Sequence, residues 1–169
     1  MCALARRNPG EVFLGLDNAY KPIMRAGLRA LEGKFKNLRF LRADIRQALT
    51  RMPDETYHRV YLQFPVPGSA GKGRRPRFFN ENFVEEIHRI LELNGIMSVI
   101  TDREGGFSEM LGLLEEAMGF RLLGDDEFHL DLDAELSSHN YQVWIGRGST
   151  PHRFEVQKIS AAESATTND

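Results

Sequence analysis

The feature that most constrains this chain is its alternation of short apolar runs with segments of helical periodicity. The apolar run Val12–Leu16 predicts a buried strand, and apolar residues at helical spacing over Tyr20–Phe35 predict a helix after it. Further apolar runs and helical patterns follow in the same alternation, at Asn37–Ala43, Ile45–Met52, Tyr57–Phe64, Asn82–Leu93, Ile96–Ile100 and Phe107–Met118. Strands that alternate with helices of about ten to fifteen residues favour an α/β fold, in which helices cover both faces of a mostly parallel sheet.

The C-terminal part of the chain departs from this alternation. Two runs with strand character, Tyr141–Ile145 and Phe154–Ile159, are separated by Gly, Ser and Pro residues. They predict a hairpin that adds antiparallel strands to the edge of the sheet. The final segment, SAAESATTND, lacks large apolar side chains. We therefore expect one domain over residues 1–160 and a disordered tail over 161–169.

Composition excludes several classes of protein. The 169 residues are 41% hydrophobic and 27% charged, which is typical of a globular domain. A single cysteine, Cys2, excludes a disulfide framework and favours a reducing compartment such as the cytoplasm. No apolar run reaches the ~18 residues that a membrane helix needs, and the start of the chain is not a secretory signal. The five histidines lack the spacing of a metal site, so no metal is expected.

Acidic residues follow the predicted strands at their carboxyl ends. Asp17 ends the first apolar run, Asp44 follows the second, and Thr101-Asp102 closes the run at Ile96–Ile100. Because ligands of parallel α/β sheets bind beyond the carboxyl ends of the strands, we expect these residues and the loop after Phe64 to be neighbours.

Each of these acids has two interpretations. Asp17 either accepts hydrogen bonds from a ribose diol or caps the helix that follows it. Asp44 either accepts a hydrogen bond from the exocyclic amine of an adenine or caps the helix predicted over Ile45–Met52. Asp102 either binds the N–H edge of a base or stabilises developing positive charge, or it caps the next segment.

The loop Pro65–Asn80 combines prolines and glycines with cations that could contact the phosphates of a nucleic acid. These cations are Lys72, Arg74, Arg75 and Arg77. The alternative is a loop that only confers solubility. Its glycine-rich part, GSAGKG, does not match the phosphate-loop pattern because Arg74 follows Gly73, so a nucleoside triphosphate site is not expected. The net charge of −2 confines any nucleic-acid binding to a local patch.

Several of these segments together resemble the tRNA (guanine-N7-)-methyltransferase family. The resemblance is carried by FPVPGSAGKGRRPRFFNENF from Phe64, by TD at 101–102, by LGLD at 14–17, by NLRFLRAD at 37–44 and by HNYQ at 139–142. It covers roughly residues 12–160. The resemblance implies a Rossmann-like class I methyltransferase sheet and transfer of a methyl group from S-adenosylmethionine to N7 of a guanine in tRNA.

The resemblance also implies roles for individual residues. Asp17 would bind the ribose of the donor, and Asp44 would lie near its adenine. The residues expected along the donor are Asp17, Asn18, Asp44, Ile45, Gln63 and Phe64. Thr101 and Asp102 would hold the target guanine. The residues expected to contact tRNA or close its pocket are Pro65, Lys72, Arg74, Arg75, Arg77, Tyr141 and Gln142.

The chain departs from the family pattern at several points. The family's first strand and Gly-rich turn have no counterpart here, and Val66, Gly68, His139 and Gln142 replace the Asp, Trp, Thr and Glu of the family motifs. These departures motivate an alternative, a non-catalytic binding or scaffold protein on the same fold. A weaker option is methylation of a different substrate. A sheet without its first strand also predicts pairing with a second copy or a partner chain that supplies a strand.

Overall fold

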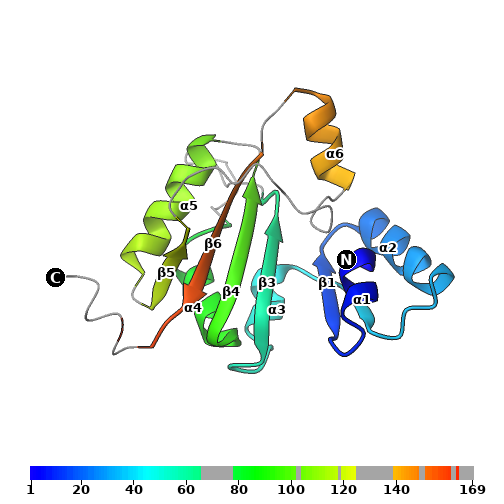
Figure 1. Ribbon diagram of the computed structural model, residues 1–169, viewed down its shortest axis with the longest axis horizontal. Coiled ribbons are helices and arrows are strands. Elements are labelled where there is room, and N and C mark those ends of the chain that lie inside the picture. Colours follow the sequence, from blue (N-terminus) through cyan, green and yellow to red (C-terminus); the bar gives the residue numbers. More distant parts are fainter. Residues whose placement is uncertain are drawn as a thin grey trace. The chain divides into compact units, whose positions relative to one another are not determined.

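The computed structural model describes residues 1–65, 78–101, 104–117, 119–124, 139–148, 151–160 and 163. These residues form helices and strands in alternation, as the sequence predicts (Figure 1). In chain order the elements are α1 (Cys2–Arg7), β1 (Phe13–Asp17), α2 (Tyr20–Glu32), β2 (Leu38–Arg42), α3 (Ile45–Leu49), β3 (Tyr57–Gln63), α4 (Glu81–Ile90), β4 (Leu91–Thr101), α5 (Glu104–Glu116), β5 (Phe120–Leu123), α6 (His139–Gly146) and β6 (His152–Lys158).

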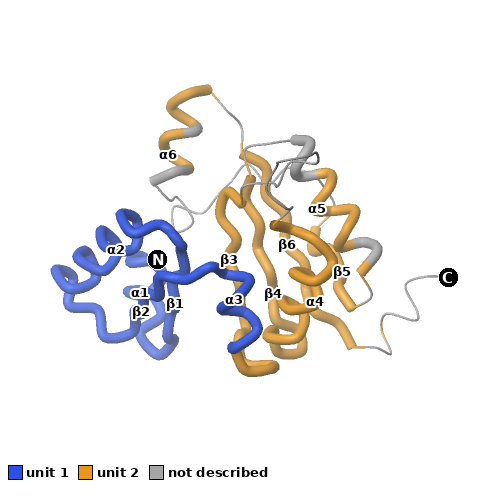
Figure 2. Tube along the Cα trace, turned by 180° about the vertical axis from the view of Figure 1, so that it is seen from behind, with its two compact units in different colours: residues 1–51, 132–138 blue, residues 52–131, 139–169 orange. Residues whose placement is uncertain are grey.

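The chain divides into two compact units, coloured separately in Figure 2. Unit 1 comprises Met1–Arg51 together with residues 132–138, which lie outside the described residues, and unit 2 comprises the remainder. The predicted domain over 1–160 spans both units and stays a prediction. Most of the predicted tail, residues 161–162 and 164–169, lies outside the described residues.

Unit 1 is built on the parallel pair β1–β2. The register runs from Phe13 opposite Leu38 to Asp17 opposite Arg42. A small core of Ala5, Ala30 and Leu38 joins α1 and α2 to these strands, and its partly buried neighbours are Cys2, Phe13, Phe35 and Phe40. The side-chain amide of Asn37 donates to three backbone carbonyls, those of Ala5 (2.9 Å), Asn8 (3.1 Å) and Glu11 (3.0 Å). This amide ties α1, which the sequence did not predict, to the start of β2.

Unit 2 contains a four-stranded sheet in the order β3-β4-β6-β5. Strands β3 and β4 are parallel, whereas β6 runs antiparallel to both of its neighbours, β4 and β5. The side chains of Met97 and Val99 on β4 are fully buried, and so is Ile87 of α4. The buried face of α4 and strand β4 thus form the centre of the core, in line with the near-continuous apolar run from Ile96 to Ile100.

The predicted C-terminal hairpin is half wrong. Strand β6 forms as expected and is antiparallel, but Tyr141–Ile145 lies in helix α6 and not in a strand. The second antiparallel partner of β6 is β5, which the sequence did not predict. Because β4 and β5 occupy both edges of β6, no edge of that strand remains for residues 141–145.

The predicted helix Asn82–Leu93 also ends earlier, at Ile90, because Leu91 already pairs with Tyr57. The pairing of β3 with β4 then shifts register before Ile96. Within this irregularity Asn94 has a φ of 66°, and a Cβ atom on Gly95 would lie 2.8 Å from the carbonyl oxygen of Glu92. A glycine at position 95 is therefore required by a close backbone approach.

We predict opposite effects of two Gly→Ala substitutions on the free energy of unfolding. Gly95→Ala should lower it by about 1–3 kcal/mol, because backbone atoms must shift to admit the methyl group. Gly112→Ala is the matched control, since Gly112 lies in α5 with no heavy atom within 4 Å of the added Cβ. That change should raise stability by roughly 0.5–1 kcal/mol. Urea denaturation measures both, and equal effects of the two substitutions would contradict the prediction.

Candidate functional site

The parallel register of unit 1 brings Asp17 and Asp44 to the same edge of the β1–β2 pair. Asp17 is the last residue of β1 and lies opposite Arg42 of β2, two residues before Asp44. The backbone N–H of Ala43 donates to the carbonyl oxygen of Asp17 at 3.1 Å, which extends the ladder to the residue beside Asp44. This is the carboxyl edge at which the sequence placed both acids.

Asp17 uses one of its two carboxylate oxygens in a local turn. Its Oδ1 accepts a hydrogen bond from the backbone N–H of Ala19 at 2.8 Å. Ala19 is the residue before α2 and has no side-chain cap of its own, so Asp17 steadies the start of that helix. Within the described part of the chain, Oδ2 of Asp17 makes no hydrogen bond. Asp17 can therefore cap the turn and still accept a hydrogen bond from a hydroxyl group of a ligand.

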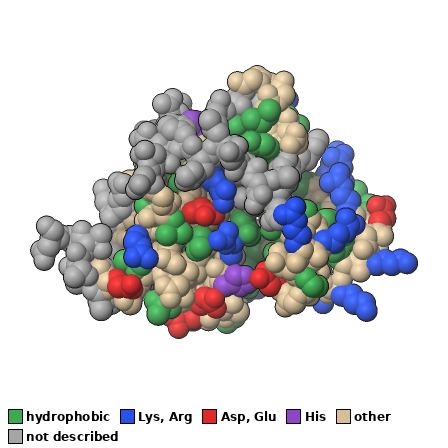
Figure 3. Space-filling model, viewed as in Figure 1, with side chains coloured by type: hydrophobic (Ala, Val, Ile, Leu, Met, Phe, Trp, Pro, Cys, Tyr) green, Lys and Arg blue, Asp and Glu red, His purple; other side chains and the backbone are tan. Residues whose placement is uncertain are grey.

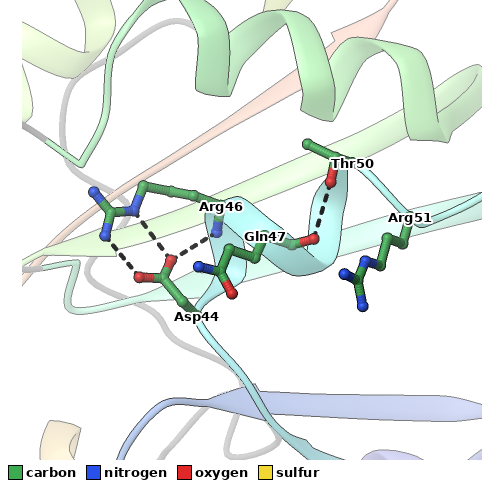
Figure 4. A pocket seen from close by; sticks show the side chains of 5 residues that line it. All are labelled: Asp44, Arg46, Gln47, Thr50 and Arg51. Atoms are coloured by element: carbon green, nitrogen blue, oxygen red, sulfur yellow. Dashed lines mark hydrogen bonds and ion pairs between the residues drawn. The ribbon is translucent and has the colours of Figure 1, made fainter.

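Asp44 is engaged on both oxygens by one residue, Arg46 (Figure 4). Oδ1 of Asp44 accepts from the backbone N–H of Arg46 and from its Nε, both at 3.0 Å, while Oδ2 accepts from Nη2 at 2.6 Å. These hydrogen bonds hold the pKa of Asp44 below its usual value and raise the pKa of Arg46. For Asp44 the hydrogen bonds from the guanidinium group have the largest effect, followed by the one from the backbone N–H. Of its two interpretations, the structure shows Asp44 as the cap of α3.

A polar hollow of about 440 Å³ adjoins this ion pair. Its lining residues are Asp44, Arg46, Gln47, Thr50 and Arg51. Figure 4 shows that all of these come from α3 and its two flanks, and that Arg51 lies away from the Asp44 carboxylate. The hollow combines two guanidinium groups with one carboxylate that is already paired, so anionic or neutral polar groups suit it better than a cation.

Unit 2 has a corresponding edge at the ends of β3 and β4. Gln63 pairs with Ile100, and the backbone N–H of Phe64 donates to the carbonyl oxygen of Ile100 at 2.7 Å. Phe64 has a φ of 51°, a left-handed conformation that a phenylalanine rarely adopts. Strained backbone of this kind is concentrated at functional sites. Thr101 ends β4 beside it, but its side chain is only 1% exposed, so it supports the edge from within the core.

Some of the remaining predicted site residues lie in the described part of the chain and the others lie outside it. Tyr141 is half-buried and Gln142 is exposed on α6, which ends six residues before His152, the partner of Thr101 in β6. Figure 1 shows α6 beyond the ends of β3 and β4. Pro65 is half-buried, directly after Phe64. Outside the described residues lie Val66, Gly68, Lys72, Arg74, Arg75, Arg77 and Asp102.

Over the ranges given above, no group of three or more His, Cys, Asp or Glu side chains is arranged to hold a metal ion. Likewise, none of the helices in the described part of the chain is both long and apolar enough to span a bilayer.

The chain matches proteins of known family along most of its length. A family model described as "Putative methyltransferase" matches residues 1–143. The tRNA (guanine-N(7)-)-methyltransferase of Rubrobacter xylanophilus is 36% identical over 156 residues, which are 92% of this chain and 70% of that protein. The chain belongs to the tRNA (guanine-N7-)-methyltransferase family. The enzyme of that name from Chloroherpeton thalassium is 30% identical over 94% of this chain and 70% of its own length.

Solved structures agree on the fold of this family member. A SAM-dependent O-methyltransferase from Thermotoga maritima superposes with a TM-score of 0.59 and 12% identity, over 94% of this chain and 55% of that one. The class I methyltransferase fold predicted from the sequence is thereby confirmed. Membership of the family implies S-adenosylmethionine as methyl donor. The open Oδ2 of Asp17 fits a ribose hydroxyl, whereas at Asp44 an adenine amine would share the carboxylate with the guanidinium of Arg46.

Sequence reasoning missed Arg46 and the strained conformation of Phe64. Arg46 had a signal, because a cation two residues after a helix-capping aspartate can reach back to the carboxylate. Phe64 had none, since its positive φ depends on how β3 leaves the sheet.

We predict that Arg46→Ala raises the pKa of Asp44 toward the usual value for a carboxyl group. Because the folded-state pKa of Asp44 is lowered, the pair stabilises the fold above the unfolded pKa, and this contribution is lost as the pH falls through the folded pKa. The variant should therefore lose a little stability at neutral pH and show a weaker loss on acidification. Carboxyl ¹³C NMR titration measures the pKa. Arg51→Ala, which removes the other arginine of the hollow, should leave it unchanged.

Proposed function

We propose that this protein transfers the methyl group of S-adenosylmethionine to N7 of a guanine in tRNA. The observation that carries the proposal is the match to tRNA (guanine-N7-)-methyltransferases over more than nine-tenths of the chain. The convergence of Asp17 and Asp44 at one carboxyl edge supports it independently, because this is where parallel α/β sheets bind nucleosides. A tRNA substrate also predicts action in the cytoplasm.

In this proposal Asp17 binds the ribose of the donor. The carboxylate keeps Oδ1 on the backbone of Ala19 and offers Oδ2 to a ribose hydroxyl, so binding does not dismantle the start of α2. Asn18 and the first residue of α3, Ile45, flank the acids at the same edge and complete the predicted donor contacts in unit 1. Gln63 and Phe64 are the predicted contacts from unit 2.

The reaction needs positioning more than proton transfer. Guanine N7 has a lone pair and no proton, so its attack on the sulfonium methyl group requires no general base. What the protein supplies is alignment of the two reactants and a carboxylate near the guanine as positive charge develops on it. The resemblance assigns that carboxylate to Asp102, and Thr101 and Asp102 together are proposed to hold the target guanine. Lys72, Arg74, Arg75 and Arg77, with Pro65, Tyr141 and Gln142, are proposed to contact the tRNA.

Mass spectrometry of tRNA nucleosides tests the activity. The purified protein with S-adenosylmethionine and unmodified tRNA should form 7-methylguanosine, and deletion of the gene should remove it from cellular tRNA. If the folded protein binds neither donor nor product in calorimetry and forms no methylated nucleoside, the non-catalytic alternative holds instead.

We predict that Asp17→Asn weakens binding of S-adenosylhomocysteine by about tenfold to a hundredfold, the worth of a hydrogen bond to a charged group. The asparagine keeps an oxygen for the N–H of Ala19, so the turn before α2 should survive. The substitution replaces Oδ2, the oxygen that is open to a ligand, with an NH₂ group. This group cannot accept a hydrogen bond from a ribose hydroxyl. Glu32→Gln, which removes an exposed acid of the same unit, is the control in isothermal titration calorimetry. Equal affinities for the two variants would exclude the assigned role of Asp17.

The expected association with another chain stays a proposal. Within the described residues β1 pairs with β2 alone, and we propose that a strand of another chain pairs with its second edge. Light scattering tests this, and a stable monomer would count against it.

A further inference from the structure

The first 51 residues carry a strong excess of positive charge that the whole-chain value conceals. They contain eleven Lys and Arg against four Asp and Glu, a formal net charge of +7. Residues 52–169 contain eleven and twenty, a net charge of −9. A chain with a net charge of −2 thus separates its charges strongly along the sequence.

All eleven of these cations are exposed. Figure 3 shows Lys and Arg side chains gathered at the right of the view, over the part of the molecule that holds α1 and α2. The four acids of these residues leave seven positive charges in excess, and Asp44 is paired with Arg46, which is not part of α2. An exposed basic surface of this kind raises the local concentration of polyanions.

Three of the cations form a row along α2. Lys21, Arg25 and Arg29 recur every fourth residue, so they lie on one side of the helix with a rise of about 6 Å between neighbours. In the part of the chain that the structure describes, none of these three side chains has a hydrogen-bond or ion-pair partner. Their charges are therefore available to a ligand. We call Lys21, Arg25 and Arg29 the α2 basic row.

An aromatic and apolar strip runs beside the α2 basic row. Tyr20 is 59% exposed at the start of α2, and the guanidinium of Arg42 lies 5.8 Å from its ring centroid. Met24, Leu28 and Leu31 continue the exposed strip along the helix. A cationic row next to an exposed aromatic ring suits a nucleic acid, because phosphates pair with the cations and an unstacked base packs on the ring.

We propose that the α2 basic row, with Tyr20 beside it, is an RNA-binding surface of unit 1. It consists of residues other than Lys72, Arg74, Arg75 and Arg77, to which the resemblance assigns tRNA contacts. It would hold the RNA through its phosphates, which gives affinity and orientation without reading sequence. The choice of tRNA as the RNA rests on the proposed function, whereas the binding surface itself does not depend on methyl transfer. An acidic protein helix is the competing occupant, but the uncompensated cations favour a polyphosphate.

Binding of a fluorescein-labelled, unmodified tRNA transcript tests the proposal without any methyl donor. Fluorescence anisotropy at several NaCl concentrations should show that Arg25→Gln/Arg29→Gln weakens binding about tenfold or more at 0.1 M salt. The slope of log K against log salt should become shallower by roughly 1.5 to 2, because two phosphate contacts are lost. Arg25→Lys/Arg29→Lys, which keeps both charges, should retain most of the affinity.

The matched control is Arg121→Gln/Arg147→Gln, which removes the same charge from two exposed arginines of unit 2. It should change affinity less than twofold. An equal loss in both double variants would mean that binding follows net charge alone, and would overturn the proposal. An unchanged affinity in the α2 variant would overturn it as well and would point to a protein partner. Because the assay contains no donor, its failure is distinguishable from a failure of catalysis.

Discussion

Parallel pairing of neighbouring strands is the constraint on which the candidate site depends. In a parallel pair both strands end at the same edge, so residues that are far apart in the chain meet there. The pairing of β1 with β2 brings Asp17 and Asp44 together across 27 residues of sequence, which include all of α2. The pairing of β3 with β4 does the same for Phe64 and Thr101. An antiparallel arrangement of either pair would send these residues to opposite edges.

At the β1–β2 edge, local hydrogen bonds decide which acid is available. Asp17 ends β1 and Asp44 caps α3 at the same edge, yet Asp17 retains an open oxygen whereas both oxygens of Asp44 accept hydrogen bonds from Arg46. The difference comes from the residue two positions further along. Ala19 offers only its backbone N–H, whereas Arg46 offers a backbone N–H and a guanidinium group. The identity of a neighbour thus determines how much of a carboxylate remains for a ligand.

The distribution of charge adds a second consequence for function. The formal net charge of the whole chain, −2, argues against a protein that is basic over its entire surface. It predicts that any nucleic-acid binding uses a local patch of cations. Folding α2 as a helix aligns Lys21, Arg25 and Arg29, which are separated by apolar residues in the sequence. A patch of this kind is invisible to composition, because the acids of residues 52–169 cancel it in the sum. RNA responds to the local field, which is screened over about 10 Å at ordinary salt.

The sequence by itself determined the alternation of strands and helices, the acids at the strand ends and the family, because hydrophobic periodicity and motif spacing are local properties of a chain. It did not predict β5, whose few residues become a strand only by pairing with β6. It predicted a strand at Tyr141–Ile145, which lies in helix α6, because the occupation of both edges of β6 by β4 and β5 cannot be read from local periodicity. The commitment of Asp44 to Arg46, the left-handed backbone at Phe64 and the register shift before Ile96 likewise arise from contacts that exist only once the strands are assembled. Tertiary structure decides these features because each depends on partners distant in sequence or on a backbone path that local propensity leaves open.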